Sequence, residues 1–168
     1  ITQTAPTATI DAANLDMNAG TSLELAGTTT VAGTVGLTAG GDITQDAGIV
    51  AVTLNLNAGG DYSQTDSTNV TGDVDIDATG AITQTGSTAT IDAANLDMNA
   101  GTSLALAGTT TVAGTVGLTA GGAVTQAAAI KTSNLEILNT GDSVVLTNTS
   151  NEIQHLQATN SNGNISVR

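Results

Sequence analysis

Apolar residues recur along this chain in short runs, separated by turns rich in Gly, Thr, Asn and Asp. Within each run apolar and polar residues alternate, which is the pattern of a β-strand with one buried face. One motif, AGTSLEL at residues 19–25 and AGGDITQ at 39–45, appears eight times with a period near 20 residues. Such a period, with a strand opening each unit, is typical of a stacked solenoid.

Aligning the repeats predicts columns of side chains that point inward, because residues two apart share a face of a strand. The first strand of each repeat contributes an apolar column of Ile1, Leu23, Ile43, Tyr62, Ile82, Leu104, Val124, Val144 and Ile165. Two residues later the same strand contributes a mixed column of Gln3, Leu25, Gln45, Gln64, Gln84, Leu106, Gln126, Leu146 and Val167.

Two further strands are predicted in each repeat. The second contributes one inward column, predicted as Ile10, Val31, Val50, Val70, Ile91, Val112, Ile130 and Ile153. The third contributes inward pairs, predicted as Leu15/Met17, Val35/Leu37, Leu54/Leu56, Val74/Ile76, Leu96/Met98, Val116/Leu118, Leu135/Ile137 and Leu156/Ala158.

Three short strands per repeat predict an all-β fold, a parallel β-helix of about eight rungs with three sheets and a triangular cross-section. Parallel crossover connections are almost always right-handed, so the coil is expected to be right-handed. Eight rungs at about 4.8 Å each give a rod of roughly 40 Å. We expect residues 1–168 to form one such segment, a piece of a longer repeat array.

A long duplication supports this alignment. Residues 1–48 match residues 82–129 at 41 of 48 positions. The seven differences are Ala5/Gly86, Pro6/Ser87, Glu24/Ala105, Asp42/Ala123, Ile43/Val124, Asp46/Ala127 and Gly48/Ala129. Only Ile43/Val124 falls in an inward column, and the other six are predicted in turns or on the outside, where substitutions cost little stability.

Composition and charge exclude some classes of binding partner from those expected for this chain. The chain has one aromatic residue (Tyr62), no Cys and a net charge of −13 from 15 acidic and two basic residues. Without a basic stripe to neutralise phosphates, nucleic acid is not an expected partner. No apolar run approaches the 18 residues or so of a membrane-spanning helix, so membrane insertion is not expected either.

Polar residues in the repeats suggest two candidate sites. The inward Gln column is expected to bond to turn backbone or to neighbouring Gln residues, since buried amides need partners; a ligand-lined groove is the alternative. Asp73, Asp75 and Asp77 share an outward face, and Asp75 is expected beside Asp97. We interpret this as a solvated acidic face, and these four carboxylates as weak candidates for Ca²⁺ binding.

Enzymatic activity is not expected, and no cofactor is predicted. Parallel β-helices that cleave polysaccharides need clustered carboxylates with basic groups nearby, whereas Lys131, His155 and Arg168 are spread over two or more rungs near one end. An ice-binding surface of Thr-x-Thr ranks is a minor alternative, but Glu24, Ala105 and other residues interrupt those ranks. From about residue 130 onward the repeats depart from the pattern, so if any face of the segment is specialised, it is expected there.

Three stretches make a family resemblance specific: GDITQ at 41–45, LNLNAGGDYSQ at 54–64 and the unit from Ile82 to Gly114. They resemble the repeat region of filamentous haemagglutinin-type bacterial surface adhesins, which are exported by two-partner secretion, and of related contact-dependent growth inhibition proteins. The resemblance implies a right-handed β-helical shaft, a secreted or cell-surface location and a role in adhesion. A receptor or glycan on another cell is then a possible partner. Further rungs of the same chain or stacked copies are expected as partners for a separate reason, because a terminal rung exposes unpaired backbone groups and the duplicated repeat can follow itself. A self-contained carbohydrate-binding or polysaccharide-acting β-helix is the alternative.

Overall fold

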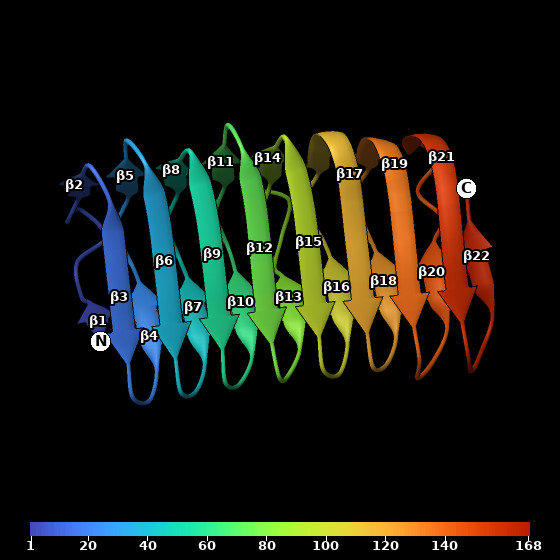
Figure 1. Cartoon of the computed structure of the whole chain (residues 1–168), viewed down its shortest axis with the longest axis horizontal. Coiled ribbons are helices and arrows are strands. Elements are labelled where there is room, and N and C mark those ends of the chain that lie inside the picture. The colour runs from blue at the N-terminus through green and yellow to red at the C-terminus, as the bar shows by residue number, and fades with distance from the viewer.

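The computed structural model describes residues 1–168 as a single solenoid of 22 β-strands without a helix. In Figure 1 the front strands point down, the rear strands point up, and the chain advances from the N-terminus at the left to the C-terminus at the right. That sense of winding is right-handed. All strand pairs are parallel, for example β4 with β7 and β12 with β15, so the predicted right-handed parallel β-helix of about eight rungs is confirmed.

Three faces surround the core, and each strand pairs with its counterpart in the next rung. The first face is a nine-stranded sheet. Its strands are β1 (Thr2–Gln3), β4 (Leu23–Leu25), β7 (Ile43–Gln45), β10 (Tyr62–Gln64), β13 (Ile82–Gln84), β16 (Leu104–Leu106), β18 (Val124–Gln126), β20 (Val144–Leu146) and β22 (Ile165–Val167). We call this sheet the β1 face.

In the first five rungs the other two faces are built from separate strands. The β2 face contains β2 (Ile10–Ala12), β5 (Thr29–Val31), β8 (Ile49–Ala51), β11 (Thr68–Val70) and β14 (Ile91–Ala93). The β3 face contains β3 (Leu15–Ala19), β6 (Thr34–Ala39), β9 (Thr53–Ala58), β12 (Asp73–Ala78) and β15 (Asn95–Ala100).

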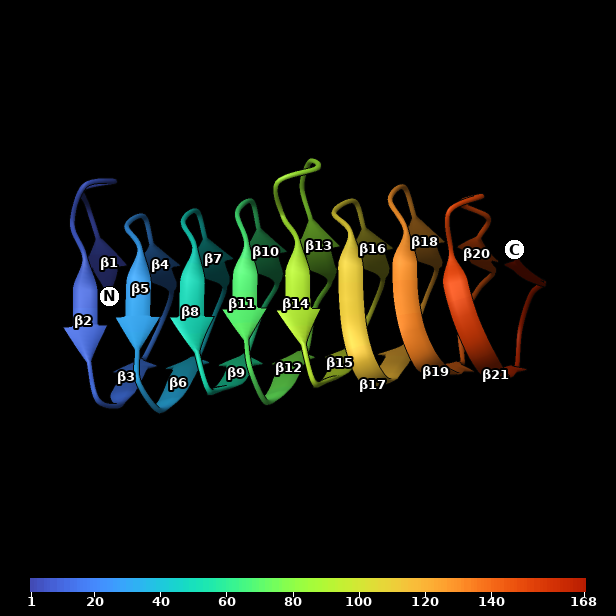
Figure 2. The same ribbon diagram turned by 90° about the horizontal axis from the view of Figure 1, so that it is seen from above.

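From the sixth rung onward one long strand covers both of these faces. These strands are β17 (Thr110–Ala120), β19 (Ile130–Asn139) and β21 (Glu152–Asn160). Because β17 pairs with both β14 and β15, the β2 and β3 faces form a single 13-stranded sheet rather than two. Figure 2 shows β17, β19 and β21 as continuous bent ribbons where the earlier rungs turn a corner.

The interior is a continuous core of 36 buried apolar residues. Cα partners in neighbouring rungs confirm four of the predicted columns, as in Leu54 opposite Val74 and Tyr62 opposite Ile82. The side chains of these four residues are almost completely buried. Because each inward residue stacks on an apolar neighbour, dispersion contacts and exclusion of water stabilise every rung against the next.

The column predicted for the β2 face does not form one stack, since Ile10 lies opposite Thr29, and Ile91 lies opposite Thr68 and Thr110. Val50 points outward and is 45% exposed, whereas Ile49 and Ala51 are buried. The strand in fact supplies two inward positions per rung, and these alternate between an Ile/Ala pair and a Thr/Val pair. The pairs in the first six rungs are Ile10/Ala12, Thr29/Val31, Ile49/Ala51, Thr68/Val70, Ile91/Ala93 and Thr110/Val112. Alternation of this kind lets successive rungs interdigitate without voids.

Candidate functional site

The most distinctive polar feature of the interior is the Gln column of the β1 face. The Gln45 side-chain amide donates to the carbonyl oxygens of Ala47 and Ser67, both at 3.1 Å. The Gln84 amide donates to the side-chain oxygen of Gln64 at 3.3 Å. The expectation that these amides bond to turn backbone or to one another is confirmed. The amides of the column therefore bond within the protein instead of lining a ligand groove, and the side-chain oxygen of Gln84 alone among them is buried without a partner.

Tyr62 completes this network in the third and fourth rungs. Its hydroxyl donates to the side-chain oxygen of Gln45 at 2.6 Å, and the Thr68 hydroxyl donates to the same oxygen at 3.2 Å. Complete burial raises the pKa of the Tyr62 phenol well above its usual range. The phenol thus stays neutral and acts as a structural hydrogen-bond donor, because ionising it in the core would be costly.

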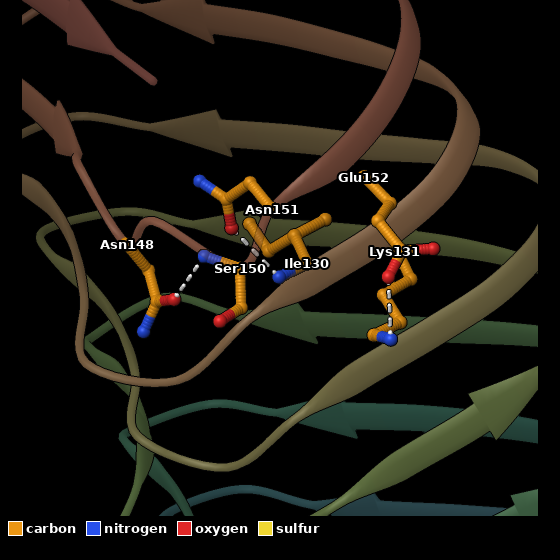
Figure 3. Close-up of polar contacts among 6 residues, drawn as sticks. All are labelled: Ile130, Lys131, Asn148, Ser150, Asn151 and Glu152. Carbon is orange, nitrogen blue, oxygen red and sulfur yellow. Dashed lines mark hydrogen bonds and ion pairs between the residues drawn. The ribbon is translucent and has the colours of Figure 1, made fainter.

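The C-terminal rungs carry a second network, centred on Asn151 (Figure 3). Its side-chain oxygen accepts from the Ile130 backbone N–H at 2.9 Å and also from the Gln126 side chain. Its side-chain nitrogen donates to the carbonyl oxygens of Leu146 and Arg168 at 3.2 and 2.8 Å. Asn151 therefore ties three successive rungs together at the turn before β21.

The neighbouring turn is held by Asn148 in a similar way. Its side-chain oxygen accepts from the Ser150 backbone N–H at 2.9 Å, and its side-chain nitrogen donates to the Ala127 carbonyl at 2.7 Å. Sequence reasoning missed both asparagines as structural groups. The sequence did contain a signal for Asn151. This amide stands at the inward position that carries Ile or Thr in the seven preceding rungs.

Lys131 and Glu152 form the only salt bridge of the chain, with 2.7 Å between the ammonium nitrogen and a carboxylate oxygen. Both side chains are largely exposed, so the pair contributes little stability. They border an open groove of about 530 Å³ on the outside of β14, β17, β19 and β21, which Asp92, Thr111 and Gln154 also line. This groove combines both charges with hydroxyl and amide groups.

The three basic or imidazole side chains do not converge. Lys131 is opposite Glu152 in the sheet register, whereas His155 lies opposite Asn134, further along the same pair of strands. Arg168 follows β22 on the β1 face. The departure from the repeat pattern from about residue 130 is seen in the Asn151 network, whereas the long strands begin earlier, at Thr110 in β17.

The acidic face predicted from the sequence lies on β12 and β15. Asp75 and Asp97 are direct neighbours in the register, and Asp73 accepts a hydrogen bond from Asn95 at 2.9 Å. Partial burial, followed by repulsion from Asp77 and Asp97, raises the pKa of Asp75. Partial burial and repulsion from Asp77 likewise raise the pKa of Asp97.

No group of three or more His, Cys, Asp or Glu side chains in the structure is arranged to hold a metal ion. Asp73, Asp75, Asp77 and Asp97 line the outside of their strands, and Asp73 is already bonded to an amide. The geometry is that of a solvated acidic face whose charges repel one another.

The outward rank of hydroxyl residues on the β1 face is interrupted. Thr44, Ser63 and Thr83 are consecutive neighbours in the register, but Glu24 and Ala105 replace the hydroxyl on either side. A surface that matches the ice lattice needs longer uninterrupted ranks of hydroxyl groups than these three rungs supply.

No helix of the structure is long and apolar enough to cross a membrane.

Comparison with known families agrees with the repeat architecture. A family model described as "Repeats of unknown function (DUF5649)" matches residues 12–64 and 93–160. The chain belongs to this family of repeats. The two DUF5649 matches cover most of the chain and together span rungs from both long copies of the duplication. No curated protein and no solved structure matches the chain.

Proposed function

We propose that this chain is part of the structural shaft of a secreted or cell-surface bacterial adhesin of the filamentous haemagglutinin type. The observation that carries the proposal is the β1 face, whose nine strands form one ladder along the whole solenoid without an insertion or a domain break. A stack of this kind resists bending and stretching, because every rung is hydrogen-bonded to the next along three faces. It is suited to hold a binding or effector region away from the cell.

The outer surface fits a spacer rather than a reaction centre. The charged side chains are scattered, the single salt bridge is exposed, and Lys131 and His155 lie apart along the same pair of strands. A net charge of −13 opposes side-by-side aggregation of such rods. The proposed partners of the shaft are further rungs of the same chain or stacked copies, while a receptor or glycan is contacted by the tip.

The duplication offers a direct test in the producing bacterium. Deleting 81 residues, from Ile1 to Ala81, would remove four rungs and leave the register of the rest intact, because Ile82 begins the second copy. We expect the shortened protein to reach the cell surface, as judged by antibody binding to intact cells, but to project less far. Retention of the intact protein in the cytoplasm would contradict the proposal.

A second candidate, binding of a polysaccharide along the side of the rod, is favoured by one feature. The groove beside Lys131 and Glu152 presents an ammonium, carboxylates, hydroxyls and an amide to solvent. Binding of chain 1–168 to an array of bacterial and host glycans would test this function. Loss of a specific signal in Lys131→Met, with a matched exposed variant such as Thr147→Met unaffected, would support it over a purely structural role.

A further inference from the structure

We propose that Asn162 is a site of spontaneous deamidation that loosens β22, the strand that follows it. Asn162 and Gly163 form the only Asn-Gly dipeptide in the chain. They lie in the turn between β21 and β22, and both residues are exposed. An Asn side chain followed by Gly has little steric obstruction between its carboxamide carbon and the next backbone nitrogen, because Gly lacks a Cβ.

The backbone at Gly163 leaves the attacking nitrogen available. No hydrogen bond in the structure engages the Gly163 N–H. The residue has a φ of 118°, one of only two positive values in the chain. This region is readily reached only by Gly, so the turn is built around a residue whose nitrogen is unhindered and free of a competing acceptor.

The chemistry requires only solvent. The Gly163 nitrogen attacks the carboxamide carbon of Asn162 and forms a carbon–nitrogen bond in a five-membered succinimide. The bond from that carbon to the side-chain nitrogen breaks, and ammonia leaves with the proton from the Gly163 amide. Water then adds to either succinimide carbonyl and opens the ring to aspartate or isoaspartate, so the net reaction consumes one water and releases one ammonia.

Other asparagines lack this combination. Asn139 is fully buried, and its side-chain oxygen accepts from the backbone N–H groups of Gly141 and Asp142. Asn57 and Asn99 lie inside strands β9 and β15, and each is followed by an Ala whose Cβ crowds the approach. Within a regular ladder the following residue cannot swing to close the ring without breaking the sheet.

Conversion of Asn162 to aspartate or isoaspartate would remove a hydrogen bond that holds the turn between β21 and β22. The Asn162 side-chain nitrogen donates to the Thr140 carbonyl at 3.0 Å, which ties this turn to the one preceding β20. A carboxylate at the same place has no proton to donate and would face a carbonyl oxygen. The isoaspartate product also lengthens the backbone by one carbon, so the turn would no longer match its neighbour.

The strand that follows depends on its ladder with β20. β22 pairs with β20, through a bond from the Val144 N–H to the Asn164 carbonyl at 2.8 Å and one from the Arg168 N–H to the Leu146 carbonyl at 3.0 Å. Ile165 is 41% exposed. We therefore infer that modification of Asn162 releases β22 while leaving the remaining ladder in place.

Ageing the folded chain at mildly alkaline pH and raised temperature tests both steps. Peptide mapping by mass spectrometry should show the mass change from carboxamide to carboxylic acid at Asn162 first, with isoaspartate as a product. Hydrogen exchange on the aged protein should be faster at the Val144 and Arg168 amides and unchanged at the Tyr62 amide. Asn162→Gln should prevent both changes, and Asn162→Asp should reproduce part of the faster exchange without ageing.

Three outcomes would overturn the proposal. If Asn162 keeps its carboxamide in the folded chain while the chain in denaturant loses it, the turn protects the residue. If other asparagines react as quickly, the site is not distinctive. Deamidation without faster exchange at Val144 and Arg168 would show that β22 does not depend on this turn.

Discussion

Tyr62 donates its phenol hydrogen to the side-chain oxygen of Gln45, one rung away, at 2.6 Å in the middle of a largely aliphatic core. Both side chains are fully buried. A buried donor left without an acceptor costs more than the bond itself contributes. The pair therefore makes the β1 face sensitive to loss of either partner and links the third rung to the fourth.

We expect Gln45→Leu to destabilise the chain by about 1–3 kcal/mol, because it removes the acceptor of the 2.6 Å bond from the Tyr62 hydroxyl and the amide that donates to Ala47 and Ser67. Leu is otherwise well accommodated in this column, as Leu25 in the adjacent rung shows. Adding Tyr62→Phe should recover part of the loss, since it removes the hydroxyl that has lost this acceptor. Urea unfolding of the two single variants and the double variant measures the coupling energy between the two side chains. If the two changes in the free energy of unfolding simply add, the side chains are not coupled.

Leu54→Asp is expected to unfold several rungs together. Leu54 is fully buried between Val35 and Val74, and no cation is nearby to pair with a carboxylate. An unpaired buried charge costs on the order of 3 kcal/mol or more, and we expect the same of Leu118→Asp. Thr38→Asp, at an exposed position of β6, should change stability by only about 0.5 kcal/mol. Thermal melting followed by circular dichroism measures these effects. A melting temperature of Leu54→Asp equal to that of the wild type would mean that the inward columns are misplaced.

Mild acid should stabilise the solenoid. The folded protein has raised pKa values at Asp75 and Asp97, mainly because both are partly buried and secondly because of neighbouring carboxylates. A raised folded pKa means that the contribution to stability is full below the unfolded value of about 3.9 and is lost as the pH rises through the folded value. The melting temperature should therefore increase as the pH is lowered from neutral toward about 4.

The double variant Asp75→Asn/Asp97→Asn tests the assignment of this effect. It should melt higher than the wild type at neutral pH and show a weaker dependence on pH. Asp11→Asn, which removes an exposed carboxylate on β2, is the charge control and should retain most of the pH dependence. An equal response from the control would assign the effect to overall charge instead.

Substitution of two glycines by alanine should have different effects on the stability of the solenoid. A Cβ at Gly108, in the turn between β16 and β17, would overlap the carbonyl oxygen of Ala89 in the preceding rung. Gly108→Ala should therefore cost about 1–3 kcal/mol through overpacking. At Gly20 nothing lies within 4 Å of the added carbon, so Gly20→Ala should leave stability unchanged or raise it by up to about 1 kcal/mol. Denaturant midpoints of the two variants compare them directly, and similar losses in both would contradict the close packing of the turns.

The sequence predicted most of the core because it carries two independent signals. Alternation of apolar and polar residues shows which side chains of a strand point inward, and the period near 20 residues shows which residues stack on one another. Leu54, Leu96 and Gln45 all lie in the columns predicted for them. The sequence also placed Asp75 beside Asp97, which the register confirms. The error at Val50 has a simple origin, because Ile49, Val50, Ala51 and Val52 are all apolar and alternation cannot choose which pair points inward.

Two identical segments show what the sequence alone did not decide. Residues 29–39 and 110–120 have the same sequence, yet the first forms two strands, β5 and β6, and the second forms the single strand β17. The following rung differs: the Ser133 hydroxyl donates to the Ala113 carbonyl at 2.7 Å, and the Thr132 hydroxyl donates to the Gly114 carbonyl at 2.9 Å. The corner of β17 is thus hydrogen-bonded by its neighbour, a role that Val52 cannot fill at the corresponding corner beside β5 and β6.

The sequence by itself determined the repeat length, the parity of most strands and the acidic surface, because these follow from local alternation and composition. Only the tertiary structure decided which buried amide bonds to which partner, where two faces merge into one sheet, and how Asn151 ties three rungs together. Those features depend on contacts between residues about one rung apart in sequence, where stacking, rather than local preference, determines which groups meet.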